Sequence, residues 1–219
     1  QGEAQMIELL TWFMDFILNL DEHLVELLQQ YGVWLYAILF LIVFAETGLV
    51  VTPWLPGDSL LFAVGTLAAI DTSGTLDATT VGALLIVAAI LGNSCNYAIG
   101  RWLGPQVFSG RYRFLKTEYL HKTEEYFIRH GGKTIVLSRF LPILRTFAPF
   151  VAGVGRMHYG RFQAFNVSGA IAWVVIFLGG GYLFGNIPIV KNNFGIVTLL
   201  IIGVSLIPVI LLTVRRTSR

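Results

Sequence analysis

The stretch SRFLPILRTFAPFVAGVGR, residues 138–156, places two arginines and two prolines inside an apolar run. The guanidinium groups of Arg139 and Arg145 stay protonated in proteins, so each needs a partner wherever this stretch is buried. Proline lacks the backbone donor that continues a helix, and Pro142 and Pro149 therefore predict breaks. A fold that accepts this stretch must combine broken helical backbone with compensated positive charge.

Composition indicates the solvent that surrounds this stretch. The chain is 55% hydrophobic and 13% charged, with a mean hydropathy of +0.71. Soluble domains carry about 25% charged residues, so we predict an all-α polytopic membrane protein. The apolar arms beside the prolines, at 134–141 and 147–155, are each too short to cross a ~30 Å hydrocarbon core. Residues 134–155 are therefore predicted to form a re-entrant hairpin.

A second broken element is predicted in the first half of the chain. Residues 33–51 are long enough to cross at about 1.5 Å per residue, but the apolar arm at 59–70 is not. Residues 33–70 are thus predicted to form another re-entrant hairpin. Its break is the sequence TPWLPGD, which contains Pro53, Pro56 and Gly57.

The other long apolar segments predict full transmembrane helices. These spans are expected at 79–100, 162–185 and 194–214. Their lengths suffice to cross the membrane, and Gly181 and Gly185, four residues apart, predict close helix packing. Together with the two hairpins they make residues 33–214 a single predicted membrane domain.

The N-terminal segment differs in character from the membrane domain. Residues 6–30 place Leu, Phe and Ile at helical spacing against acidic residues, which predicts an amphipathic helix. Such a helix can lie at the membrane interface or pack against the protein's own surface. Residues 1–5, QGEAQ, are predicted to be an added remnant, with Met6 as the natural start.

Charge is distributed unevenly along the chain and predicts its orientation. Residues 1–100 contain ten acids and no Lys or Arg, whereas residues 101–219 contain fifteen bases and three acids. The positive-inside rule places the polar segment 101–133 and the basic tail 215–219 in the cytoplasm. The two hairpins then open on opposite sides, as in the inverted repeats of secondary transporters.

Four charges fall on the two broken elements. Glu46 and Asp58 belong to the first hairpin, and Arg139 and Arg145 to the second. Charges at membrane depth are expected to pair or to serve a transport pathway. One interpretation is a set of permanent ion pairs that lock the hairpins, although burial makes such pairs poor stabilisers. The other is a functional cluster, in which arginine binds phosphate and a carboxylate carries a proton.

Other classes of function find little support in the sequence. The four histidines are scattered without metal-ligand spacing, and Cys95 is the only cysteine, so an intrachain disulfide is excluded. The glycine-rich GGGYLFG lacks the Lys-Ser/Thr of a phosphate loop. Ser138 and His158 have no local partners of the kind that a phosphatase needs, so we predict that the chain is not an enzyme. A purely structural membrane organiser would leave four costly charges idle.

Three motifs resemble the DedA family of bacterial inner-membrane proteins, within the superfamily of SNARE-associated or VTT domains. They are FAETGLVVTPWLPGDSLL, NYAIGRWLG and GGKTIVLSRFLPILRTFAPFVAGVGRMHYGRF. The resemblance covers nearly the whole chain from Met6. It implies a polytopic fold with two re-entrant hairpins and a link to envelope integrity and the proton motive force.

The resemblance also implies roles for particular residues. The family's essential membrane acids match Glu46 and Asp58, and its essential arginines match Arg139 and Arg145. At Asn93 many family members carry Asp, so proton coupling in this chain is expected to differ or to depend wholly on the two matched acids. Some members move undecaprenyl phosphate, and distant eukaryotic relatives scramble phospholipids.

We therefore predict a flippase linked to the proton motive force that translocates undecaprenyl phosphate for carrier-lipid recycling. A phospholipid scramblase and a small-ion/proton antiporter are the alternatives. The expected partners are a lipid phosphate, protons and membrane lipids, without cofactor, metal or nucleic acid, and the oligomeric state is left open. The predicted location is the bacterial inner membrane, multi-pass, with the C-terminus in the cytoplasm.

Overall fold

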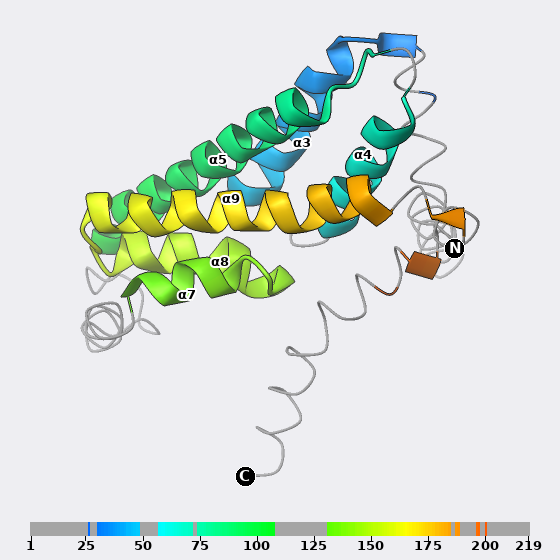
Figure 1. The fold of residues 1–219 in the computed structure, drawn as a ribbon. Coiled ribbons are helices and arrows are strands. Elements are labelled where there is room, and N and C mark those ends of the chain that lie inside the picture. The colour runs from blue at the N-terminus through cyan, green and yellow to red at the C-terminus, as the bar shows by residue number, and fades with distance from the viewer. Residues whose placement is uncertain are drawn as a thin grey trace, which may run out of the picture. The chain divides into compact units, whose positions relative to one another are not determined.

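The structure is a computed structural model of the 219-residue chain. It describes residues 30–48, 57–71, 74–107 and 131–184, together with isolated positions at 26, 187, 188, 196, 197 and 200. Within these residues all regular structure is helical, as predicted (Figure 1). The segment 1–25, most of the predicted span 194–214 and the basic tail lie outside the described residues.

Two of the described helices are long and apolar. They are α5, Ala78–Val107, and α9, Tyr159–Phe184 (Figure 1). Ala78–Gly104 and Tyr159–Phe184 have mean hydropathies of 1.8 and 1.9, yet only 39% and 33% of their most apolar windows are buried inside the protein. A core helix of a soluble protein would be mostly buried. These helices instead expose apolar side chains, as expected for helices that face lipid.

Two short apolar helices lie on either side of the first predicted break. The first is α3, Trp34–Gly48, with 15 residues, and the second is α4, Gly57–Ile70, with 14 residues. At about 1.5 Å per residue neither reaches the ~30 Å of a hydrocarbon core. Gly57 is the first residue of α4, whereas Pro53 and Pro56 lie outside the described residues.

The second broken element consists of α7, Gly131–Ser138, and α8, Pro142–Val154. The break lies before Pro142, where Leu141 is extended with φ −121° and ψ 107°. A residue that precedes proline is forced out of the helical region, and proline at the start of a helix lacks only a donor that has no helical acceptor there.

Pro149 lies inside α8, so the prediction that Pro142 and Pro149 both interrupt the helix is wrong in its second half. The arms predicted at 134–141 and 147–155 are accordingly displaced toward the N-terminus. Proline removes one helical hydrogen bond, which a membrane helix tolerates when a neighbouring helix supplies other donors. The carbonyl that loses its helical donor is that of Arg145, and the side-chain amide of Asn96 on α5 donates to the next carbonyl in the chain, that of Thr146, at 2.6 Å.

The described residues divide into two compact units. Unit 1 contains residues 30–38 with the start of α3, all of α4, residues 71 and 74–82, and the end of α9 from residue 174. Unit 2 contains residues 39–48, 83–107 and 131–173, and thus the end of α3, most of α5, all of α7 and α8, and the first part of α9.

Unit 2 depends on close backbone contact between α5 and α8. A Cβ at Gly100 would overlap the carbonyl of Phe150, and one at Gly153 would overlap the carbonyl of Tyr97. Small residues at helix interfaces permit this approach and are typical of membrane helices. The adjoining core is apolar and consists of Tyr97, Ile135, Ala148, Ala152, Met157 and Phe162.

In unit 1, glycines likewise permit close backbone contact, here between α4 and the end of α9. A Cβ at Gly65 would overlap the Leu178 carbonyl, and one at Gly181 would overlap the Phe62 carbonyl. The hydroxyl of Thr66 donates to the Gly181 carbonyl at 3.2 Å. Gly181 therefore supports the close packing predicted for it, while Gly185 lies outside the described residues.

Candidate functional site

An ion pair between Glu46 and Arg145 lies inside unit 2. Glu46 is near the C-terminal end of α3 and Arg145 is in the first turns of α8. The side chains are 0% and 5% exposed, so both charges are removed from solvent. The guanidinium carbon of Arg145 also lies 5.7 Å from the centre of the Trp173 ring, within range of a cation–π interaction.

The position of Glu46 is unfavourable for an isolated carboxylate. The C-terminal end of a helix carries partial negative charge and disfavours an acid there. Burial adds to this cost unless an opposite charge is close. Arg145 supplies that charge, and each residue therefore makes the other acceptable in an apolar interior.

Asn96 on α5 holds the two helices together beside this pair. Its side-chain amide donates to the carbonyl of Thr146 at 2.6 Å and to that of Thr47 at 3.4 Å. Thr47 follows Glu46 in the chain, and Thr146 follows Arg145. One buried amide thus joins α3 and α8 at the residues next to the ion pair. This role of Asn96 was not predicted, although an asparagine in the apolar segment 79–100 was a signal.

Arg139 occupies the break between α7 and α8 and is 3% exposed. Its terminal nitrogen Nη2 donates to Oδ1 of Asn166 at 2.6 Å, and to the carbonyls of Ala89 and Asn166 at 3.4 Å each. Its Nε, also buried, has no hydrogen-bond partner among the described residues. Within the same part of the chain no carboxylate forms an ion pair with this guanidinium, so its hydrogen bonds go to neutral oxygens.

The first part of α9 is shaped around Arg139. Gly169 lies one turn beyond Asn166, and a Cβ there would approach the Cδ and Nε of Arg139 to 3.1 and 3.2 Å. The same face of α9 therefore supplies one acceptor and one space for the arginine side chain. Asn166 was another residue that sequence reasoning missed, although a polar side chain within the apolar run 162–185 pointed to it.

Asn93 is 2% exposed and belongs to the same network. Its amide nitrogen donates to Oδ1 of Asn166 at 3.1 Å, the atom that also accepts from Arg139. Asn93, where many family members carry Asp, is thus linked to the buried guanidinium through the side chain of Asn166.

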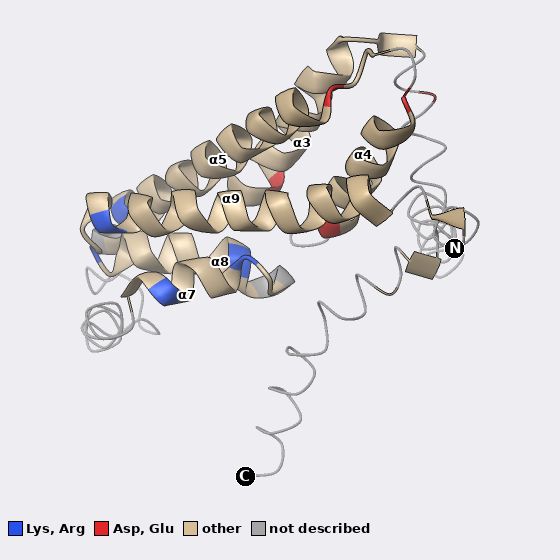
Figure 2. Cartoon of the chain, viewed as in Figure 1, with Lys and Arg blue, Asp and Glu red and all other residues tan. Residues whose placement is uncertain are grey.

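Asp58 is the predicted charge that belongs to unit 1. It is 6% exposed and lies in the first turn of α4, where the positive end of the helix favours an acid. Glu46, Arg139 and Arg145 all belong to unit 2. Figure 2 shows the bases on α7, on α8 and at the start of α9, and acids on α3 and α4.

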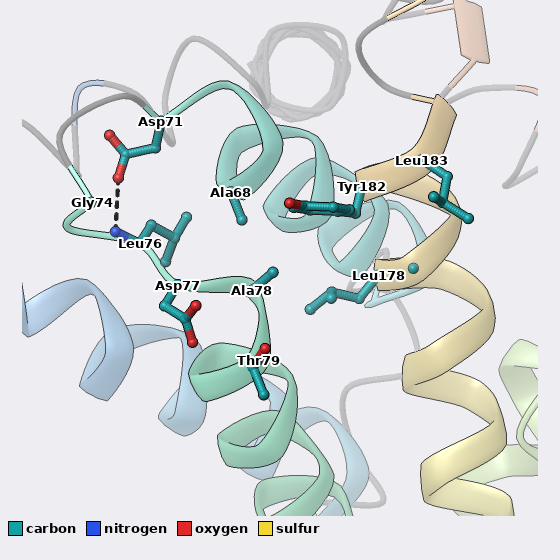
Figure 3. A pocket seen from close by; sticks show the side chains of 11 residues that line it. Ala68, Asp71, Gly74, Leu76, Asp77, Ala78, Thr79, Leu178, Tyr182 and Leu183 are labelled. Carbon is teal, nitrogen blue, oxygen red and sulfur yellow. Dashed lines mark hydrogen bonds between the residues drawn. The ribbon is translucent and has the colours of Figure 1, made fainter.

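Unit 1 has an open pocket of about 550 Å³ (Figure 3). Its walls combine apolar side chains at the end of α9, among them Leu178 and Leu183, with the carboxylates of Asp71 and Asp77. The Asp71 carboxylate accepts from the Leu76 amide at 2.8 Å. Hydrogen bonds from Thr80 lower the pKa of Asp77 and keep it ionised at the start of α5. The described residues contain no group of three His, Cys, Asp or Glu that could hold a metal.

Long apolar helices that expose their apolar faces, together with buried charges on and beside short helices, are consistent with an α-helical membrane protein. The chain matches the VTT domain over residues 55–183. It is 50% identical to Protein DedA of Escherichia coli strain K12 over 210 residues, 95% of each chain. The chain belongs to the DedA family of membrane proteins.

Two further relatives extend this comparison. An uncharacterized membrane protein of Mycobacterium tuberculosis strain H37Rv is 40% identical over 181 residues, which cover 81% of this chain and 78% of the relative. Inner membrane protein YqjA of Escherichia coli strain K12 is 37% identical over 156 residues, which cover 71% and 70% of the two chains. No solved structure matches the chain.

Proposed function

We propose that this chain is a flippase that moves a lipid phosphate, undecaprenyl phosphate, across the bacterial inner membrane and is driven by the proton motive force. In this proposal Arg139 and Arg145 bind the phosphate, and Glu46 and Asp58 carry protons. The protein acts as a transporter and not as an enzyme. The relative Inner membrane protein YqjA of Escherichia coli supports the location.

The environment of Arg139 is the observation that carries this proposal. A buried guanidinium with neutral oxygens as its partners keeps a full positive charge in an apolar interior. Such a charge is costly unless an anion compensates it at some stage of the protein's cycle. Phosphate suits this role, because a guanidinium can donate two parallel hydrogen bonds to its oxygens.

The Glu46–Arg145 pair supports a proton-dependent step. While Glu46 is ionised, its carboxylate occupies the guanidinium of Arg145. Protonation of Glu46 would remove that negative charge and leave Arg145 available to a phosphate oxygen. The Glu46 carboxylate and the phosphate are then alternative partners of one cation, so binding of the anion is coupled to uptake of a proton. Asp58 would be the second proton carrier.

The short helices support the two re-entrant hairpins that this transporter requires. The pair α3 and α4 forms one hairpin, which opens to the periplasm, and the pair α7 and α8 forms the other, which opens to the cytoplasm. The proposed full spans within the described residues are α5 and α9. This arrangement places the broken elements, with their charges, within the membrane.

Cysteine labelling tests this orientation. In a Cys95→Ser background, Thr75→Cys is expected to react with an impermeant thiol reagent in intact cells, because residues 71–77 face the periplasm. Thr117→Cys is expected to react only after the cells are permeabilised. Labelling of position 117 but not of position 75 in intact cells would reverse the proposed topology.

Transport in liposomes tests the function itself. Purified protein is expected to move labelled undecaprenyl phosphate between the leaflets faster than protein-free liposomes do, and faster still under a pH gradient. Arg139→Ala should reduce the rate to the protein-free level, whereas Arg161→Ala, which removes an exposed base from the start of α9, should not. A transport rate that does not change with the pH gradient would favour passive scrambling. A rate equal to that of protein-free liposomes would contradict transport of this lipid.

A further inference from the structure

Two buried side-chain amides, those of Asn93 and Asn166, orient the guanidinium of Arg139. Oδ1 of Asn166 accepts from Nη2 of Arg139 at 2.6 Å and from the amide nitrogen of Asn93 at 3.1 Å. The amide nitrogen of Asn166 donates in the opposite direction, to Oε1 of Gln163 at 2.9 Å and to the Ile90 carbonyl at 3.1 Å. All these residues belong to unit 2.

The orientation of the Asn166 amide is fixed by these contacts. A flip would turn its NH₂ group toward two other donors, Arg139 and Asn93, and its oxygen toward two acceptors. All four hydrogen bonds described above would then be lost. The oxygen of Asn166 therefore stays directed at the guanidinium, and Asn93 acts as the residue that keeps it there.

Asparagine at this position has a specific electrostatic consequence. An amide oxygen orients the guanidinium through a hydrogen bond but carries no net charge. Aspartate has nearly the same shape, yet it would place a full negative charge beside Nη2, where low dielectric makes the attraction strong. With aspartate the charge of Arg139 would be neutralised from within the protein.

We propose that the Asn93–Asn166 amide pair makes the Arg139 site selective for anionic headgroups, because it positions the guanidinium and leaves its charge to the ligand. Asn166 is a specificity-determining residue and Asn93 is a positioning residue. This inference rests on the proposed function, in which Arg139 binds the phosphate of a lipid. It adds that selectivity for phosphate depends on two neutral residues of α5 and α9.

The test compares binding of undecaprenyl phosphate and undecaprenol to purified full-length protein by native mass spectrometry. The readout is the ratio of the two affinities. A general loss of packing would weaken the binding of both lipids and leave this ratio unchanged. Asn166→Asp should lower the preference for phosphate about tenfold or more. The new carboxylate would pair with Arg139, so the phosphate would lose its charge-assisted interaction with that guanidinium. Thermal stability without ligand is measured alongside to show that the variant folds, because the new ion pair with Arg139 is offset by a carboxylate oxygen that faces the Ile90 carbonyl.

Gln163→Glu is the matched control. It makes the same change from amide to acid one turn earlier on α9, where the side chain contacts Ser94, Tyr159 and Asn166 but not Arg139. A carboxylate there can accept from the Asn166 amide and the Tyr159 hydroxyl, while Ser94 keeps its hydrogen bond to the Ile90 carbonyl. The phosphate preference should therefore stay within about twofold of the natural value. If Gln163→Glu lowered the preference as much as Asn166→Asp, any added negative charge near the site would explain the result. The specific role of Asn166 would then be contradicted.

Two more variants make the outcomes distinguishable. Asn93→Asp places the new carboxylate one hydrogen bond further from Arg139 and should lower the ratio by a smaller factor, which also covers the case that Asn166→Asp fails to fold. Arg139→Ala should abolish the preference. If Arg139→Ala keeps the preference, the proposed function fails. If it loses the preference while folded Asn166→Asp and Asn93→Asp keep it, only the inference about the amides fails.

Discussion

Glu46→Gln is expected to lower the free energy of unfolding by about 3–5 kcal/mol, because it leaves the buried cation of Arg145 without the carboxylate that compensates it. Arg145→Gln should cost less, since the remaining Glu46 can bind a proton and become neutral whereas an arginine cannot lose one. Thermal or denaturant unfolding in detergent measures both effects. Arg161→Gln, which changes an exposed base, should stay within about 0.5 kcal/mol of the natural protein.

The double variant Glu46→Gln with Arg145→Gln separates a structural role from a functional one. It removes both buried charges, and two neutral side chains of similar size should restore most of the stability. We expect this folded variant to remain inactive in transport, because it lacks a proton carrier and a phosphate ligand. Full transport by the double variant would mean that the pair only locks the fold.

Much of this fold follows from lengths and charges that can be counted along the chain. The segments 79–100 and 162–185 predicted long helices, and α5 and α9 are long apolar helices that contain nearly all of these residues. The breaks near Gly57 and before Pro142 were also predicted, because proline and glycine act on the local backbone. Burial of Glu46, Asp58, Arg139 and Arg145 is consistent with their place in apolar sequence.

The remaining features depend on contacts between distant residues. Pro149 lies within α8 and does not end it. The packing of α5 beside this turn, where Asn96 donates to the Thr146 carbonyl, cannot be derived from the local sequence. The choice of Arg145 and not Arg139 as the partner of Glu46 is set by how α3 meets α8. Asn96 and Asn166 were visible as polar residues in apolar helices, but their acceptors and donors lie about 27 to 76 positions away.

Arg139→Ala is expected to have the largest effect on lipid binding. The side chain is buried, its hydrogen bonds go to neutral oxygens, and its charge is the one that a phosphate would compensate. Arg139→Lys keeps the charge but loses the planar fork, so it should retain only a minor part of the affinity. Arg161→Ala removes an exposed arginine from the same unit and should leave binding unchanged.

The comparison of undecaprenyl phosphate with undecaprenol tests the central claim most directly, because the two lipids differ only in the phosphate. Titration of the purified protein, followed by native mass spectrometry or thermal shift, gives both affinities. We predict that the phosphate binds at least about tenfold more tightly, as expected for a charge-assisted interaction with a buried arginine, and that Arg139→Ala removes the difference. Equal binding of the phosphate and the alcohol by the natural protein would show that the buried arginines serve the fold and not the substrate.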